Sequence, residues 1–152
     1  MASTQDTASV AQGRVLVGFG RLLRFQGEIE RAEAFLNHGL AISRKREDAV
    51  TTAYVLVTLG SLATQRGAYD RAHRFLEEAL FSAAAIGDPV VDAALTGMAL
   101  ANLGLAAHGR GNLEEARARR EQSLHISREH GYHLGIVRSL CDLGDVARDQ
   151  GD

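Results

Sequence analysis

The sequence predicts an all-α fold of stacked, antiparallel helix hairpins, and three observations lead to it. Glycines recur at two fixed positions, seven residues apart, along most of the 152-residue chain. Apolar residues between them return at spacings of three and four residues, which is the period of an α-helix. No segment alternates polar and apolar residues over a useful length, and the chain holds 1 proline. Repetition at a long period indicates units that bury their apolar faces against one another.

The first recurring glycine lies inside an apolar, helical pattern in each unit. Its four positions, spaced by 40, 44 and 40 residues, are Gly20, Gly60, Gly104 and Gly144. A glycine within a helix costs about 1 kcal/mol relative to alanine. Because the cost recurs in every unit, we expect a neighbouring helix to pass too close for a Cβ atom.

The second recurring glycine is expected to end the helix that contains the first. Only glycine adopts the left-handed cap conformation without strain. These caps are Gly27, Gly67, Gly111 and Gly151, and two further glycines, Gly87 and Gly131, are expected to end the second helices. Asp88 and Pro89 form the start signal of the next unit, with Asp88 as N-cap and Pro89 in the first helical position.

Seven helices follow from these signals, within a single repeat array that fills residues 1–152. Their expected ranges are about 6–26, 28–45, 48–66, 68–86, 89–110, 112–130 and 133–150. The corresponding units are about 6–46, 47–87 and 88–131, followed by a half repeat at 132–152. A small residue, Ala32, Ala72 or Ala116, stands where the two helices of each complete hairpin are expected to cross.

The second unit carries a family resemblance. Its pattern Leu56-x2-Leu59-Gly60-x2-Ala63, followed by Ala72-x3-Leu76, resembles the tetratricopeptide repeat. The resemblance covers nearly the whole chain but departs in two respects. The period is 40 to 44 residues instead of the usual length of about 34, and the proline that closes the family's second helix is missing. The resemblance implies a right-handed superhelix, with the first helix of each unit lining its concave side.

Long-period variants similar to this chain occur in kinesin light chains, in Leu-Gly-Asn polarity adaptors and in bacterial transcription activators of the maltose-regulator type. The fourth unit stops where its second helix should begin. We therefore expect a segment of a larger bacterial regulatory protein, with a capping last helix as the alternative. The outer face of that helix is expected to be polar and to carry Arg138, Asp142, Asp145, Arg148 and Asp149.

Composition excludes several function classes. The net charge of −2 gives no electrostatic footprint for direct nucleic-acid binding. The single cysteine, Cys141, fits a reducing compartment, and the N-terminus lacks the pattern of a signal peptide. The most apolar window spans about 15 residues and contains polar ones, so no membrane span is expected. These features predict a cytoplasmic protein.

Candidate catalytic and metal-binding residues do not form a recognisable site. His125, His130 and His133 straddle the helix break at Gly131 and have no spacing typical of a helical zinc site, so no metal or cofactor is expected. Cys141 is expected to pack as a small apolar residue. The charge run from Glu114 to Gln122 is expected to form a solvated helical face with pairs four residues apart. We predict that the protein is not an enzyme.

The resemblance assigns inward-facing side chains on the first helix of every unit. They are Arg14, Arg21, Arg24, Tyr54, Thr58, Ser61, Gln65, Met98, Asn102, His108, Arg138, Asp142 and Asp145. This set lacks the lysine and asparagine arrangement with which chaperone-binding relatives clamp acidic C-termini. Its arginines gather in the first unit, facing the acids of the last, so a bound peptide is expected to direct its acidic part toward the first unit.

Two functional hypotheses remain open at this stage. The leading one is a non-enzymatic module that binds a protein or peptide partner through the concave groove. The alternative is a sensor domain of a transcription regulator, which binds a small molecule or a signalling peptide. Under either hypothesis, an exposed end of the repeat array allows a homodimer.

Overall fold

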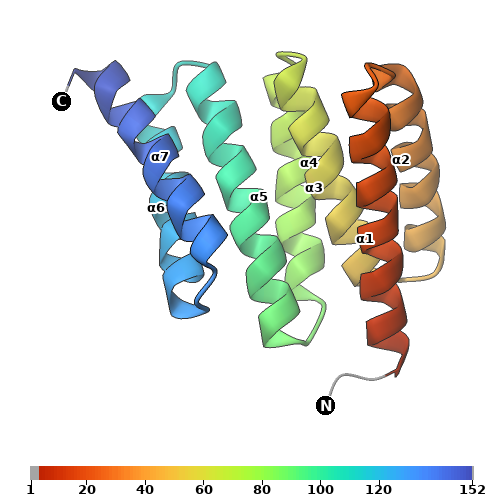
Figure 1. Ribbon diagram of the computed structural model, residues 1–152. Coiled ribbons are helices and arrows are strands. Elements are labelled where there is room, and N and C mark those ends of the chain that lie inside the picture. The colour runs from red at the N-terminus through yellow and green to blue at the C-terminus, as the bar shows by residue number, and fades with distance from the viewer. Residues whose placement is uncertain (1–3, 152) are drawn as a thin grey trace.

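The computed structural model describes residues 4–151, and seven α-helices and no strand lie within that range (Figure 1). The helices are α1 (Thr4–Phe25), α2 (Ile29–Lys45), α3 (Ala49–Gln65), α4 (Tyr69–Ala84), α5 (Pro89–Gly109), α6 (Leu113–Glu129) and α7 (His133–Gln150). The all-α prediction is confirmed, and the helix ends lie close to the expected positions.

Side-chain caps and glycines fix the ends of the helices. The carboxylate of Asp48 accepts a hydrogen bond from the backbone N–H of Thr51 at 3.0 Å. Asp88 likewise accepts from Val90 and Val91, directly before Pro89. All six glycines predicted to end helices have a positive φ, between 67° and 82°. These contacts satisfy backbone groups that a helix terminus would otherwise leave unpaired.

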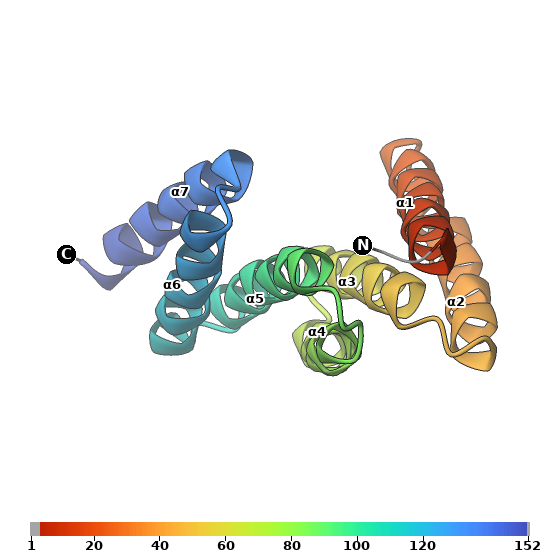
Figure 2. The ribbon, with the colours of Figure 1, turned by 90° about the horizontal axis from the view of Figure 1, so that it is seen from below.

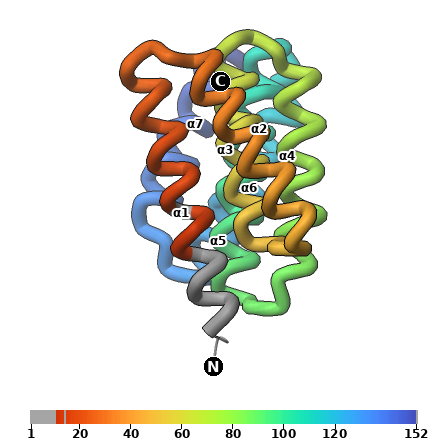
Figure 3. The backbone as a smooth tube through the Cα atoms, turned by 90° about the vertical axis from the view of Figure 1, so that its right-hand side faces the viewer, coloured from red at the N-terminus to blue at the C-terminus, as the bar shows by residue number. Residues whose placement is uncertain are grey.

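The hairpins stack into an α-solenoid. Viewed from below, α1, α3, α5 and α7 lie along the inner side of an arc, and α2, α4 and α6 lie on its outer side (Figure 2). The view along the stack from the α1–α2 end shows the same two layers (Figure 3). The longer spacing of 44 residues arises from one added helical turn, because α5 begins 15 residues before Gly104 whereas α3 begins 11 before Gly60.

Small residues sit where the helices of a hairpin cross, as predicted. Ala32, Ala72 and Ala116 are all fully buried. A Cβ atom at Gly60 would lie 2.5 Å from Cγ of Leu76, so the glycine is required for this close approach. The alanines and glycines together let the two helices of each hairpin approach closely.

A neighbouring helix was predicted to leave no room for a Cβ atom at the first recurring glycine of every unit. Besides Gly60, this prediction holds for two of the other three glycines. A Cβ atom at Gly20 would lie 3.1 Å from Leu36, and one at Gly104 would lie 2.9 Å from Arg120. At Gly144 the prediction is wrong, because no atom lies within 4 Å of such a Cβ. No described helix covers that side of α7.

Helix α5 is apolar over a longer stretch than the sequence analysis predicted. It has 21 residues, and its most apolar window has a mean hydropathy of 1.5, so its length and composition alone would suit a membrane span. The structure gives another reason for this composition. Helix α5 lies at the centre of the stack and packs against α3, α4, α6 and α7, and 56% of its most apolar window is buried there.

Candidate functional site

Two of the three arginines predicted to face inward on α1 have no charged partner among the described residues. Arg21 is exposed and Arg24 is half-buried, and neither forms an ion pair with another described residue. Arg14 belongs to α1, but its side chain lies outside the described part of the chain. Two unneutralised guanidinium groups, one turn apart, therefore mark the first unit.

The predicted residues of α3 differ in how far they are available. The ring of Tyr54 packs over Gly13, where an added Cβ would lie 2.9 Å from the ring. The hydroxyl of Thr58 donates to the backbone oxygen of Tyr54 at 2.9 Å, so it already has an acceptor. Ser61 is half-buried and Gln65 is exposed. Gln65 is therefore the most accessible of the predicted polar groups on this helix.

On α5 the structure corrects one assignment. Asn102 is 5% exposed and its amide nitrogen donates to the backbone oxygen of Met98 at 2.8 Å, so it does not form part of an accessible surface. Met98 itself is 41% exposed. His108 lies on the same helix and places Nε2 at 2.7 Å from Oδ2 of Asp149. This contact joins α5 to α7 across the inner layer.

The acidic end predicted for α7 is neutralised. Asp142 forms an ion pair with Arg120, and Asp145 pairs with Arg148 at 3.0 Å. Arg138 stays exposed, with a weaker contact of 3.9 Å to Asp142. Among the described residues, Asp142 and Asp145 thus have cationic partners, whereas Arg21 and Arg24 have no charged partner, which does not match the predicted field between a positive and a negative end of the array.

Arg120 also corrects the interpretation of the charge run. It is 2% exposed and lies over Gly104, in the position that Leu76 occupies over Gly60. Burial lowers the pKa of the Arg120 guanidinium, and the nearby Asp142 carboxylate acts in the opposite direction. The sequence signal was present, because Leu36, Leu76 and Arg120 each stand 16 residues after their glycine.

A hollow lies between the C-terminal ends of α3 and α5 and the start of α4, and two of the six residues that line it were predicted. The hollow has a volume of about 360 Å³ and opens outward. Its lining consists of Thr64, Gln65, Tyr69, Leu105, His108 and Gly109. Gly109 makes room for the ring of Tyr69, because an added Cβ would lie 2.4 Å from Cε1. Sequence analysis missed Tyr69, Leu105, Gly109 and Thr64, although Gly109 falls outside the repeat pattern and could have signalled a local contact.

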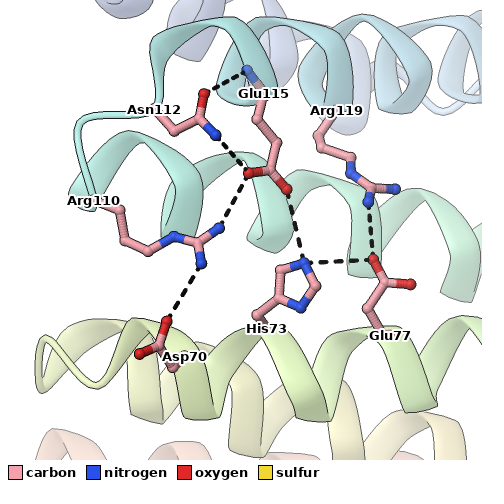
Figure 4. A network of polar contacts seen from close by, with 7 residues as sticks. All are labelled: Asp70, His73, Glu77, Arg110, Asn112, Glu115 and Arg119. Atoms are coloured by element: carbon pink, nitrogen blue, oxygen red, sulfur yellow. Dashed lines mark hydrogen bonds and ion pairs between the residues drawn. The ribbon is translucent and has the colours of Figure 1, made fainter.

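The outer layer uses its charges differently. In Figure 4, α4 and the start of α6 are joined by a network of polar contacts. Its members are Asp70, His73, Glu77, Arg110, Asn112, Glu115 and Arg119. Glu115 and Arg119 were predicted to pair within α6, but they contact other segments instead: Glu115 pairs with Arg110 at 3.1 Å, and Arg119 pairs with Glu77 of α4 at 2.9 Å.

One contact of the outer layer recurs between units. The residue that follows α3 or α5, Arg66 or Arg110, reaches back to an acid in the first turn of the preceding outer helix. Arg66 lies 3.5 Å from Glu30, and Arg110 lies 3.4 Å from Asp70. These pairs occupy equivalent positions in successive units, so the outer arginines are engaged in joining neighbouring units.

Potential reactive groups do not converge in the described residues. No group of three or more histidine, cysteine, aspartate or glutamate side chains there is arranged to hold a metal ion. Cys141 was expected to pack inside, but it is exposed on α7. The expectation failed because no helix covers the equivalent of the hairpin face on α7.

Comparison with known proteins agrees with this architecture. No curated protein matches the chain. The crystal structure of a TPR-like protein from Chlorobium tepidum matches with a TM-score of 0.68 and 17% sequence identity, covering 95% of this chain and 99% of that one. At this identity the match shows the fold alone. The family model of the tetratricopeptide repeat matches residues 11–80 and 95–152, leaving out the segment with the added turn of α5. The chain belongs to the tetratricopeptide repeat family.

Proposed function

We propose that this chain is a non-enzymatic module that binds an acidic segment of a protein partner on its concave side. Tetratricopeptide repeats generally mediate protein–protein interactions. The observation that carries the proposal is a contrast between arginines: Arg21 and Arg24 have no charged partner among the described residues, whereas Arg66 and Arg110 pair with acids of neighbouring units. A concave wall strengthens the field of unpaired charges, so these two arginines attract carboxylates.

The hollow between α3 and α5 supplies an anchor point. Leu105 and the ring of Tyr69 give it an apolar lining, and Gln65 and His108 provide polar groups at its edge. Neighbouring helices lie about 10 Å apart, so the hollow is roughly 15 Å from α1. In an extended peptide this distance corresponds to about four residues. We therefore propose a ligand with an acidic cluster about four residues from one large apolar side chain.

The hollow favours a peptide side chain over a free small molecule. Small-molecule sites usually enclose most of the ligand surface. This hollow opens outward, and its lining residues Gln65 and Gly109 are exposed. The long repeat period supports a further proposal, that the module works within a bacterial, cytoplasmic regulatory protein.

Selection from a display library of random peptides, about 12 residues long, tests the ligand class. We expect enriched sequences to combine an acidic cluster with one leucine, phenylalanine or methionine at the stated spacing. The matched selection uses Leu105→Asp, which changes the hollow without touching the arginines. It should retain the acidic preference and lose the apolar one.

Two outcomes would contradict the proposal. One is enrichment of basic or uncharged sequences. The other is no enrichment at all, together with a rise in melting temperature of several degrees on adding a sugar or another small metabolite, since a ligand that binds only the folded state stabilises it. That second outcome would support the sensor hypothesis instead.

A further inference from the structure

Helix α7 leaves an apolar face uncovered at the end of the stack. Leu134, Val137 and Leu140 are 83%, 58% and 47% exposed. Cys141 is exposed beside them, and the space over Gly144 is empty to 4 Å among the described residues. We call these five residues the end face. Exposed apolar residues that gather on one helix face indicate an interaction surface more strongly than scattered ones do.

The equivalent positions of α3 show which kind of element packs against such a face. In α3, 84 residues earlier, the five positions are buried, and they hold Val50, Ala53, Leu56, Val57 and Gly60. Leu76 of the antiparallel helix α4 fills the space over Gly60. The end face of α7 is thus fitted to an antiparallel helix that places a leucine over Gly144.

We propose that the end face binds α7 of a second copy of this chain, forming a two-fold symmetric dimer. A two-fold axis perpendicular to α7 makes the two helices antiparallel and brings the same flank of each together. With the axis near Cys141 and Asp142, Leu140 of each copy lies close to Gly144 of the other. No other described segment is needed to complete the contact.

Charge supports this choice of partner. Arg138 and Asp145 lie seven residues apart, two turns along one flank of the end face, and both are about half exposed. Within one copy, Asp145 pairs with Arg148 at 3.0 Å and Arg138 lies 3.9 Å from Asp142, so the pairs between copies replace exposed pairs on α7. In the antiparallel pair, Arg138 of each copy faces Asp145 of the other, so the flank is complementary to itself. Opposite charges placed in this way select the orientation and the partner.

The dimer is expected to be weak and reversible. A contact one helix wide falls at the small end of specific interfaces. We therefore expect a dissociation constant in the micromolar range, and a weight-average mass that rises from 16.3 kDa toward twice that value with concentration. This inference does not depend on what the concave side binds.

Sedimentation equilibrium with charge-reversal variants tests the proposal. Arg138→Asp or Asp145→Arg alone places like charges opposite each other and should weaken the dimer about 10-fold or more. The double variant exchanges the two charges and should return to within about threefold of the parent. Arg74→Asp, an exposed change on α4, is the matched control and should leave the association unchanged.

Two further measurements locate the contact. Cys141 is the only cysteine, so a short bismaleimide should link two copies through that residue, because the helices lie about 10 Å apart in such a pair. Val137→Ser alters the end face and should lower the weight-average mass. Leu22→Ser alters the apolar side of α1, at the opposite end of the stack, and should leave that mass unchanged. Circular dichroism establishes that each variant is folded.

Several results would overturn the inference. A chain that stays monomeric at several hundred micromolar contradicts it. Association that resists both single charge reversals contradicts the proposed pairing of Arg138 with Asp145. Association that Leu22→Ser abolishes, or that continues beyond two copies, indicates an end-to-end contact instead of the two-fold one.

Discussion

The arginines that join neighbouring units and the arginines of α1 are in different electrostatic states. Arg66, Arg110 and Arg119 each lie within 3.5 Å of a carboxylate from another helix. On α1, Arg21 and Arg24 have no such partner among the described residues. The same residue type thus joins units in the first group and presents charge in the second.

This difference indicates which arginine charges are available to a ligand. Exposed ion pairs contribute only about 0 to 1 kcal/mol each, but they cancel one another's field. An unpaired arginine on a concave wall keeps its field and can attract a carboxylate. A net charge of −2 for the whole chain is therefore compatible with unpaired positive charge at Arg21 and Arg24 of α1.

The largest expected effect comes from breaking the scaffold that both layers share. Ala72 is fully buried where α3 and α4 cross. Ala72→Arg should lower the free energy of unfolding by several kcal/mol, because the hairpin must either bury the charge or separate. Thermal melting followed by circular dichroism measures this effect. The matched control is Ala41→Arg, an exposed change on α2. A melting temperature for Ala72→Arg within a degree or two of the parent would contradict the assigned crossing.

The next effect concerns Arg120, the arginine that is buried among the described residues. Asp142→Leu leaves the guanidinium of Arg120 without its partner and should cost about 2 to 3 kcal/mol, less than a fully buried pair because Asp142 is partly exposed. Replacing both residues by leucine should restore the free energy of unfolding to within about 1 kcal/mol of the parent. Leu36 and Leu76 already occupy the equivalent position in the other hairpins.

Urea denaturation measures both variants. Asp145→Leu, measured at a protein concentration low enough to keep the chain monomeric, breaks the exposed pair with Arg148; it serves as the control and should change the stability by less than about 1 kcal/mol. If the double variant is no more stable than Asp142→Leu alone, the interpretation of the buried pair is wrong.

Identical substitutions at two equivalent glycines should have opposite effects. Gly60→Ala places a Cβ atom against the buried Leu76 and should destabilise the fold by about 1 to 3 kcal/mol. Gly144→Ala meets no atom and should stabilise the chain by up to about 1 kcal/mol through helix propensity. Denaturation at low protein concentration separates these changes from self-association. Destabilisation by both substitutions would show that α7 is covered.

The smallest expected effect on stability comes from removing single arginines of the two groups. Arg66→Ala and Arg110→Ala should each cost less than about 1 kcal/mol, and salt should reduce the difference from the parent. Arg21→Ala should have no comparable effect on stability, because it breaks no ion pair. A larger stability loss for Arg21→Ala than for Arg66→Ala would contradict the distinction between arginines that join units and arginines that present charge.

Much of the fold could be predicted because its signals are local. Glycines at helix ends, the N-cap Asp88 and the small residues at the crossings act within one or two turns of chain, and the structure confirms them. Their fixed spacing then indicates that units of the same shape stack. A repeat pattern makes the fold easier to predict, because every unit carries the same local signals independently.

The environment of single side chains was harder to predict. Arg120 is polar by type, but its long aliphatic stem packs where the other hairpins hold a leucine. Helical periodicity identifies the face on which Cys141 lies, but it does not tell whether a neighbour covers that face. Asn102 was misassigned for a related reason, because the curvature of the stack decides which inward positions stay open.

The measurement that tests the central claim most directly is a peptide titration at two salt concentrations. The probe is a fluorescein-labelled peptide of about 12 residues, with a glutamate cluster about four residues from one leucine. Fluorescence anisotropy compares the parent, the double variant Arg21→Glu/Arg24→Glu, and Lys45→Glu, an exposed change at the end of α2 outside the groove. At low salt, the double variant should bind about 10-fold or more weakly than the parent, and Lys45→Glu should stay within about twofold. Equal losses in both variants would contradict the account and would show that Arg21 and Arg24 belong to an ordinary solvated surface.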